Sequence, residues 1–163
     1  MLSRITFCLV ISVLSIAVVG CTNHPASDSV KAFSIALQDS AWVSAWNMLT
    51  PETQVAWDST AVILHEFGYT ESRSFLESLN SPVTEEEFTF LDGEMLFERM
   101  LSSTPEITNL SRSVRSVELP DSLTALVTIA TSIGDQIIPV KFDGVNWLID
   151  LTTLSPPPEI PAE

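Results

Sequence analysis

Residues 137–150 read IIPVKFDGVNWLID, and this stretch decides the fold class. Asp143-Gly144 stands between two runs of strand-forming residues, and this dipeptide is among the strongest short-range hairpin signals. The pattern therefore predicts a strand over 136–142, a tight turn, and a second strand over 145–151. One face of the second strand would carry three apolar side chains: Trp147, Ile149 and Leu151.

Upstream of this hairpin, the apolar pattern keeps the period of two that is typical of strands. Residues 123–131 alternate strictly and predict a strand, and Gly134-Asp135 predicts the turn that follows it. Residues 107–119 predict a further long strand, turned at Pro120-Asp121-Ser122. The second half of the chain is therefore expected to form an antiparallel meander of four strands.

The first half has the period of helices instead. Ser27 or Asp28 can cap a first helix, which Asp39-Ser40 would interrupt before a second short helix over 41–49. Thr50-Pro51-Glu52 combines a capping hydroxyl, a proline at the first helical position and an acid in the first turn. The helix that starts there would end at Gly68.

Three more helical signals follow before the strands begin. Thr70 can start a helix over 71–79, Thr84 and Glu87 form a capping box, and a helix over 94–101 follows Asp92. Helices followed by a meander indicate the α+β class. We expect one domain over 28–154, with N-terminal helices packed on a curved, four-stranded antiparallel sheet.

The N-terminus has the composition of a secretory signal. Arg4 is the only charge in the first 27 residues, and 5–19 is mostly apolar. A spanning helix needs about 20 apolar residues, and this run is shorter. The run ends in Val18-Val19-Gly20-Cys21, so we expect cleavage between Gly20 and Cys21. A signal peptide without lipidation and a retained anchor are the alternatives.

These four residues resemble the lipobox of bacterial lipoproteins, with Val18 where that family most often has Leu. The resemblance implies that Cys21 carries a diacylglyceryl group, with palmitate among its acyl chains, after residues 1–20 are removed. One acyl chain anchors a protein only marginally, whereas two anchor it stably. In two-membrane bacteria, an Asp after the cysteine retains such proteins in the inner membrane; Thr22 implies outer-membrane delivery here.

Residues 21–27 are expected to form a polar tether, and the proline-rich residues 155–163 an exposed tail that cannot pair in a sheet. Cys8 would leave with the signal, so no cysteine would remain for a disulfide in the domain. The part after the signal contains six basic and 21 acidic residues. This charge excludes nucleic acid as a partner and opposes binding to anionic lipid. We predict no cofactor and no metal, since no calcium-loop motif is present.

Three stretches of the chain resemble the ketosteroid-isomerase-like superfamily, which is also called nuclear-transport-factor-two-like. They are 30–42, 45–52 and 137–150, with Asp39-Ser40 where the superfamily usually has Gly-Asp. The resemblance implies a cone-like fold, in which the sheet curls around the helices and leaves an apolar pocket. The enzymes of the superfamily place an Asp base, and sometimes Tyr or His, in that pocket. None of their catalytic positions aligns with this chain.

The candidate site residues each have a structural alternative. Trp42, Trp46, Trp57 and Tyr69 can line a ligand pocket, or they can belong to the core. His65-Glu66 lacks the second histidine of a zinc-binding H-E-x-x-H motif. His65 is the one candidate for a general base, and a solvated position near a helix end is its alternative.

Two classes of function remain open. The first is a membrane-anchored lipoprotein of the cell envelope that binds an envelope protein or a small apolar ligand without catalysis. The second is a small-pocket isomerase or dehydratase that uses a carboxylate or His65. The first is favoured because no set of convergent polar residues is recognisable in the sequence.

Overall fold

The computed structural model describes residues 23–103, 113–131 and 134–152. Within these ranges the chain forms six helices and then four strands, so the predicted α+β class is confirmed. The helices are α1 (Pro25–Gln38), α2 (Trp42–Trp46), α3 (Pro51–Phe67), α4 (Tyr69–Ser78), α5 (Glu85–Phe88) and α6 (Gly93–Ser102). The strands are β1 (Val114–Glu118), β2 (Thr124–Thr131), β3 (Gly134–Phe142) and β4 (Trp147–Ile149).

The four strands form one open sheet in the order β1-β2-β3-β4, with every neighbouring pair antiparallel. The predicted meander is therefore confirmed. The outer edge of β4 is covered by a short parallel contact with the chain between α2 and α3. There the Thr50 N–H donates to the Ile149 carbonyl at 2.9 Å, and the Ile149 N–H donates to the Met48 carbonyl at 2.8 Å.

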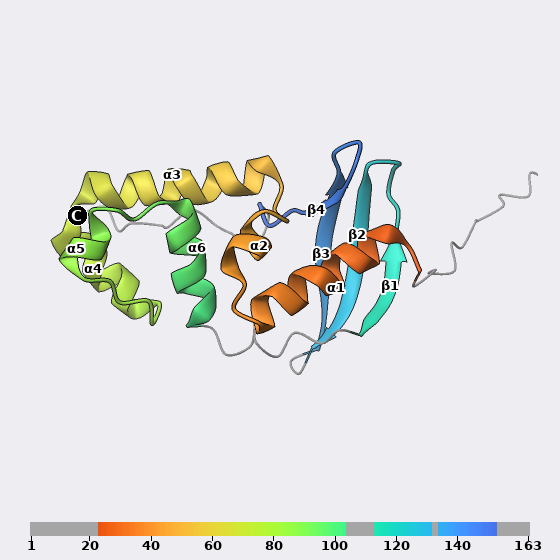
Figure 1. Cartoon of the computed structure of the whole chain (residues 1–163), viewed down its shortest axis with the longest axis horizontal. Helices are drawn as coiled ribbons and strands as arrows, with labels where there is room; N and C mark the ends of the chain where they lie inside the picture. Colours follow the sequence, from red (N-terminus) through yellow and green to blue (C-terminus); the bar gives the residue numbers. More distant parts are fainter. Residues whose placement is uncertain (1–22, 104–112, 132–133, 153–163) are drawn as a thin grey trace, which may run out of the picture.

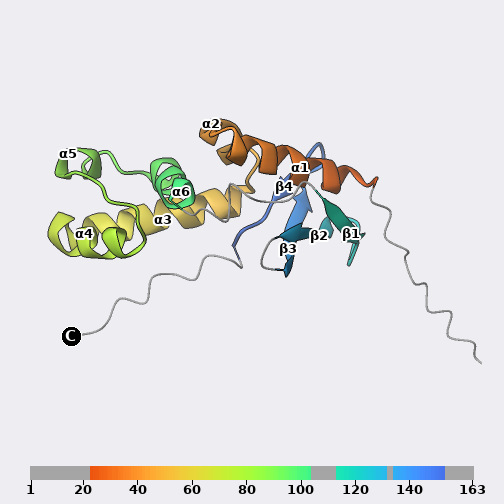
Figure 2. The same ribbon diagram turned by 90° about the horizontal axis from the view of Figure 1, so that it is seen from below.

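The helix α1 lies over one face of the sheet (Figure 2), and the apolar core of this half lies between them. Alternation along β2 directs its small and branched side chains toward the helix, as the sequence predicted. The buried apolar residues of this core come from α1 and from all four strands: Ala26, Val30, Phe33, Ala36, Leu37, Val117, Ala125, Val127, Ile129, Val140 and Ile149.

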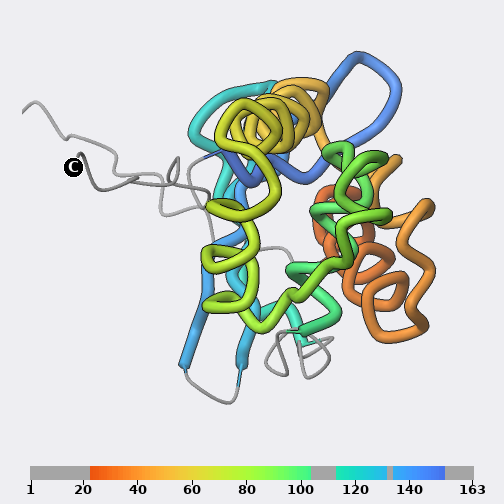
Figure 3. The backbone as a smooth tube through the Cα atoms, turned by 90° about the vertical axis from the view of Figure 1, so that its left-hand side faces the viewer, coloured from red at the N-terminus to blue at the C-terminus, as the bar shows by residue number. Residues whose placement is uncertain are grey.

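The helices α3 to α6 form a second half that extends away from the sheet along the long axis of the molecule (Figure 1). A view along that axis shows α3 end-on, with the strands on one side and α1 and α2 on the other (Figure 3). The helices α3 and α6 come close at Gly93. A Cβ there would lie 2.5 Å from the backbone nitrogen of Asp58 and 2.9 Å from its Cα. A glycine is therefore required at this contact.

The helix α1 begins at Pro25, so Ser27 and Asp28 are not its caps. Pro25 occupies the first turn, where its missing N–H costs nothing, and His24 accepts the Ala26 N–H through Nδ1 at 3.2 Å. Ala26 and Ser27 are fully buried. The predicted tether over 21–27 is therefore too long, and the domain begins before residue 28.

Most other helix ends agree with their local signals. Thr50 caps α3, Gly68 ends it with a φ of 84°, the capping box of Thr84 and Glu87 forms, and Asp92 caps α6. The second helix is shorter than predicted, at Trp42–Trp46. It ends early because the chain from Met48 to Thr50 pairs with β4 instead.

Two predicted turns differ from the structure. Gly134 and Asp135 belong to β3, where they pair with Thr131 and Ala130, so the turn does not include them. The closing hairpin does turn at Asp143-Gly144, but its loop extends to Asn146. It is longer because the Asp143 carboxylate accepts two N–H groups of the loop. Strand β1 lies within the predicted 107–119, and residues 107–112 lie outside the described ranges.

Candidate functional site

The predicted lipidation and cleavage residues, Cys21 and Gly20, lie outside the residues that the structure describes, as does the tail over 155–163. Acylation of Cys21 therefore stays a prediction. In the described part of the chain, no helix is both long enough and apolar enough to cross a bilayer.

Two of the candidate tryptophans meet around one phenylalanine. The rings of Trp46 and Trp57 each lie 5.6 Å from the ring of Phe97, which is fully buried. Trp42 is half-buried and also packs against the core. These contacts join α2, α3 and α6, so the aromatic side chains here act as packing between helices.

Trp57 has an unusual feature for a core residue. Its side chain is almost completely buried, yet the indole Nε1–H has no hydrogen-bond acceptor among the described residues. A buried donor without a partner costs about 1–3 kcal/mol. The aromatic cluster is therefore held together by ring packing against this cost.

Tyr69, the fourth candidate, lies elsewhere and does line a hollow. An open hollow of about 400 Å³ lies between α4 and α5, at the end of the molecule farthest from the sheet. The Tyr69 hydroxyl donates to the Val83 carbonyl at 3.2 Å. The hollow is lined by side chains of α4, of α5 and of the loop between them: Tyr69, Arg73, Glu77, Pro82, Val83, Thr84, Glu85 and Glu87.

The charges around this hollow are mostly negative. Arg73 is paired with Glu77 at 2.7 Å, and the hydrogen bond and charge of Glu77 raise the pKa of Arg73. Glu87 accepts the Thr84 N–H at 2.8 Å, which lowers the pKa of Glu87, and it also pairs with Arg99. Glu85 adds a third carboxylate, so the hollow has an anionic rim and an aromatic wall.

His65 does not line the hollow. Its Nε2 lies 2.8 Å from the Leu91 carbonyl, so the ring donates there, and its ring centroid lies 4.8 Å from that of Phe88. The side chain thus links the last turn of α3 to the loop before α6. This role is structural, and the sequence signal of a lone histidine gave no hint of its carbonyl partner.

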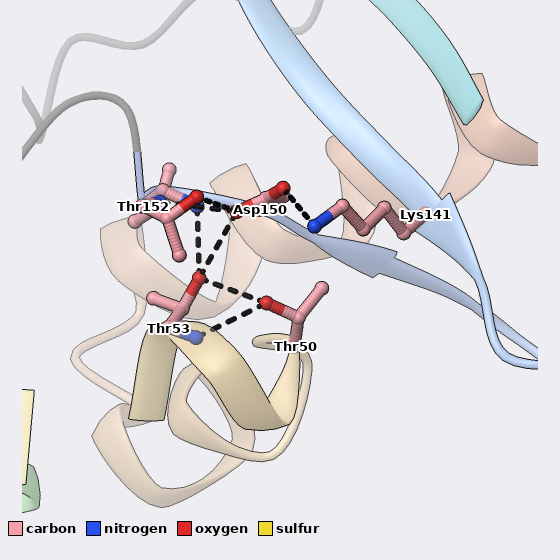
Figure 4. A network of polar contacts seen from close by, with 6 residues as sticks. Thr50, Thr53, Lys141, Asp150 and Thr152 are labelled. Atoms are coloured by element: carbon pink, nitrogen blue, oxygen red, sulfur yellow. Dashed lines mark hydrogen bonds and ion pairs between the residues drawn. The ribbon is translucent and has the colours of Figure 1, made fainter. Parts of the chain in front are cut away.

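A buried carboxylate that the sequence reasoning missed lies where the two halves meet (Figure 4). Asp150 accepts from Lys141 Nζ at 2.8 Å and from the Thr152 hydroxyl at 2.6 Å. The Thr53 hydroxyl, at the start of α3, accepts the Leu151 N–H at 3.0 Å and lies 2.9 Å from the Thr50 hydroxyl. The network therefore joins the end of β4 to the first turn of α3.

Burial alone would raise the pKa of Asp150, but the hydrogen bonds from Lys141 and Thr152 outweigh it, so the pKa of this carboxyl is lowered. The same pair raises the pKa of Lys141. Both groups thus hold their charges at neutral pH and are engaged with each other. Asp150 is not among the residues that line the hollow.

In the described ranges, no group of three or more His, Cys, Asp or Glu side chains is arranged to hold a metal ion. In comparisons with known proteins, no family model, no curated protein and no solved structure matches the chain. The placement of these groups in the fold is therefore what bears on the function of the chain.

Proposed function

We propose that this chain is a lipid-anchored binding module of the cell envelope. In this proposal, residues 1–20 are removed, Cys21 carries the acyl chains, and the domain lies outside the cytoplasm, at the outer membrane if the host has two. The apolar run that ends in Val18-Val19-Gly20-Cys21 supports the anchor. The order of helices and meander supports a ketosteroid-isomerase-like, cone-like domain.

The observation that carries the proposal is that the start of the domain and the hollow lie at opposite ends of the molecule. The helix α1 begins beside the sheet, whereas α4 and α5 lie at the opposite end (Figure 1), and these two helices line the hollow. Cys21 precedes His24 by three residues, which can span about 10 Å at most. An anchor at Cys21 would hold the sheet half next to the bilayer and present the hollow to the space beyond.

The chemistry of the hollow favours a protein partner over a small apolar ligand. Its rim carries Glu77, Glu85 and Glu87, of which Glu77 pairs with Arg73 and Glu87 with Arg99. A lysine or arginine side chain of an envelope protein could pair with these carboxylates and lie against the Tyr69 ring, since cations are attracted to aromatic faces. Nucleic acid and anionic lipid would be repelled by the same charges.

The alternative of a small-pocket isomerase or dehydratase draws no support from the geometry. The Nε2 of His65 is bonded to the Leu91 carbonyl, and Asp150 is bonded to Lys141 and Thr152. A general base must lie within hydrogen-bond reach of the substrate, and neither His65 nor Asp150 lines the hollow. A binding role is therefore the better supported of the two.

Two measurements test the proposal. Mass spectrometry of the purified membrane form should find a diacylated Cys21 at the N-terminus, and the Cys21→Ala variant should leave the membrane fraction. An unmodified chain that retains residues 1–20 would contradict the anchor.

The hollow is tested with a short lysine-rich peptide and a glutamate-rich peptide of equal length as control. In NMR titration of the full chain, the lysine peptide should shift the resonances of Tyr69 and Thr84, and the glutamate peptide should not. Glu85→Gln should weaken this binding. Equal shifts with both peptides, or shifts confined to the sheet half, would contradict the assignment of the hollow.

A further inference from the structure

Three exposed apolar side chains gather at one end of the sheet. Val145 lies in the β3–β4 turn and is 80% exposed, while Leu119 and Leu123, 45% and 56% exposed, flank the β1–β2 turn. In a meander these two turns lie at the same end of the sheet, as Figure 1 shows. The Phe142 N–H donates to the Leu123 carbonyl at 2.8 Å, which ties the two turns together. Where exposed apolar side chains form a patch, they mark a protein or membrane contact surface.

The start of the domain lies beside this end. The ring of His24 meets the ring of Trp147 edge to face, with centroids 5.0 Å apart. Trp147 is the first residue of β4 after the turn, and its ring also lies 5.3 Å from that of Phe142. His24 is therefore held against the hairpin that carries Val145. Cys21, three residues upstream, is within about 10 Å of it along the chain.

The two turns also carry carboxylates, and each carboxylate accepts backbone N–H groups of its own turn. Asp121 accepts the Leu123 N–H at 2.7 Å, and Asp143 accepts the Val145 and Asn146 N–H groups at 2.8 and 2.7 Å. These bonds lower the pKa of both carboxyls, so both stay ionised. Apolar side chains beside ionised groups suit the headgroup region of a bilayer and do not suit its hydrocarbon centre.

We propose that the two hairpin turns bearing Leu119, Leu123 and Val145 rest in the interfacial region of the bilayer that holds the acylated Cys21. This inference rests on the lipid anchor proposed above and adds a second contact, which would fix the orientation of the domain. The occupant is a lipid surface with few net negative charges, because Asp121 and Asp143 would be repelled by an anionic one. Val62, 57% exposed on α3, has a similar apolar exposure but lies in the other half.

The test uses the acylated full chain in phosphatidylcholine vesicles. Val145→Cys gives the processed chain a free thiol for an environment-sensitive fluorophore, because Cys8 has left and Cys21 is modified. Val62→Cys is the matched control. We expect the label at 145 to brighten, to shift to shorter wavelength and to be quenched by nitroxide-labelled lipid, whereas the label at 62 should do none of these. Vesicles with anionic lipid should reduce the response at 145.

The possible failures are distinguishable. If neither labelled chain floats with the vesicles, the anchor fails and this inference fails with it. If both float and the label at 145 behaves like that at 62, the anchor stands and the contact of the turns is wrong. If the label at 145 brightens with rising protein concentration and without vesicles, the turns bind a second copy of the chain, which also overturns the inference.

Discussion

The half made of α1 and the sheet and the half made of α3 to α6 are stabilised in different ways. The sheet half has a continuous apolar core between one long helix and paired strands of up to nine residues. The apolar core continues into the helical half, where Leu64, Leu76 and Leu96 are buried. This half adds specific contacts: the close approach at Gly93, the ring cluster around Phe97, and side-chain caps. Substitutions at these single points should therefore have large effects in the helical half.

The halves also differ in charge. Residues 51–103 contain eleven carboxylates and two arginines, whereas the described residues on either side of them contain seven carboxylates and three basic residues. Both arginines of the helical half are paired with glutamates. This contrast agrees with the proposed arrangement, in which the sheet half lies close to a membrane and the helical half meets a cationic partner.

The largest effect is expected from Phe97→Ala. Phe97 is fully buried between Trp46 and Trp57, so its removal leaves a cavity where three helices meet. Loss of a buried phenylalanine costs about 3–5 kcal/mol, and urea unfolding should show this. Phe90→Ala, at a 72% exposed position, is the control and should change stability little. Equal losses in both variants would refute the idea that this cluster holds the helical half.

Gly93→Ala should have the next largest effect. The added Cβ would collide with the backbone of Asp58, which no rotamer change can relieve. The helices α3 and α6 must then move apart, at a cost of about 1–3 kcal/mol. Glu94→Ala, one residue later in the same helix, is the control. A Gly93→Ala variant as stable as this control would show that the two helices separate freely.

Asp150→Asn should lower the free energy of unfolding by about 1–2 kcal/mol, because it weakens the network that joins the two halves. The cost is moderate because the pair with Lys141 is only partly buried. The pKa of Asp150 is lowered in the folded state, so its stabilisation is present above the unfolded pKa of about 3.9 and is lost as pH falls through the folded value. The stability of the variant should therefore fall less than that of the unchanged protein as the pH is lowered. If urea unfolding showed the same loss of stability at acidic pH in the variant and in the unchanged protein, Asp150 would not have this role.

The sequence predicted the features that depend on neighbouring residues. Thr50 was expected as a helix cap, and Gly68 as a helix end, because each serves backbone groups within a few positions. The cap at His24 was missed because histidine is a rare cap, although Pro25 after it was a usable signal.

The contacts between distant residues could not be predicted in the same way. Thr53 and Asp150 are separated by 97 positions, and only the pairing of β4 with the chain before α3 brings them together. Trp46 was expected in a ligand pocket or in the core, but nothing in the sequence indicated that Phe97 packs against it. The hollow beside Tyr69 likewise depends on how the loop between α4 and α5 folds.

The smallest effect is expected from Trp57→Phe, where two opposing terms nearly cancel. The smaller ring loses some packing against Phe97, but it also removes the buried indole N–H that has no acceptor among the described residues. Because an unpaired buried donor costs about 1–3 kcal/mol, the net loss should stay within about 1 kcal/mol. Trp57→Ala removes the packing as well and should lose about 3–5 kcal/mol. If urea unfolding showed that Trp57→Phe destabilises the protein as much as Trp57→Ala, the indole N–H would have an acceptor such as a bound water. A hydrogen bond would then stabilise the cluster in addition to the packing of the rings.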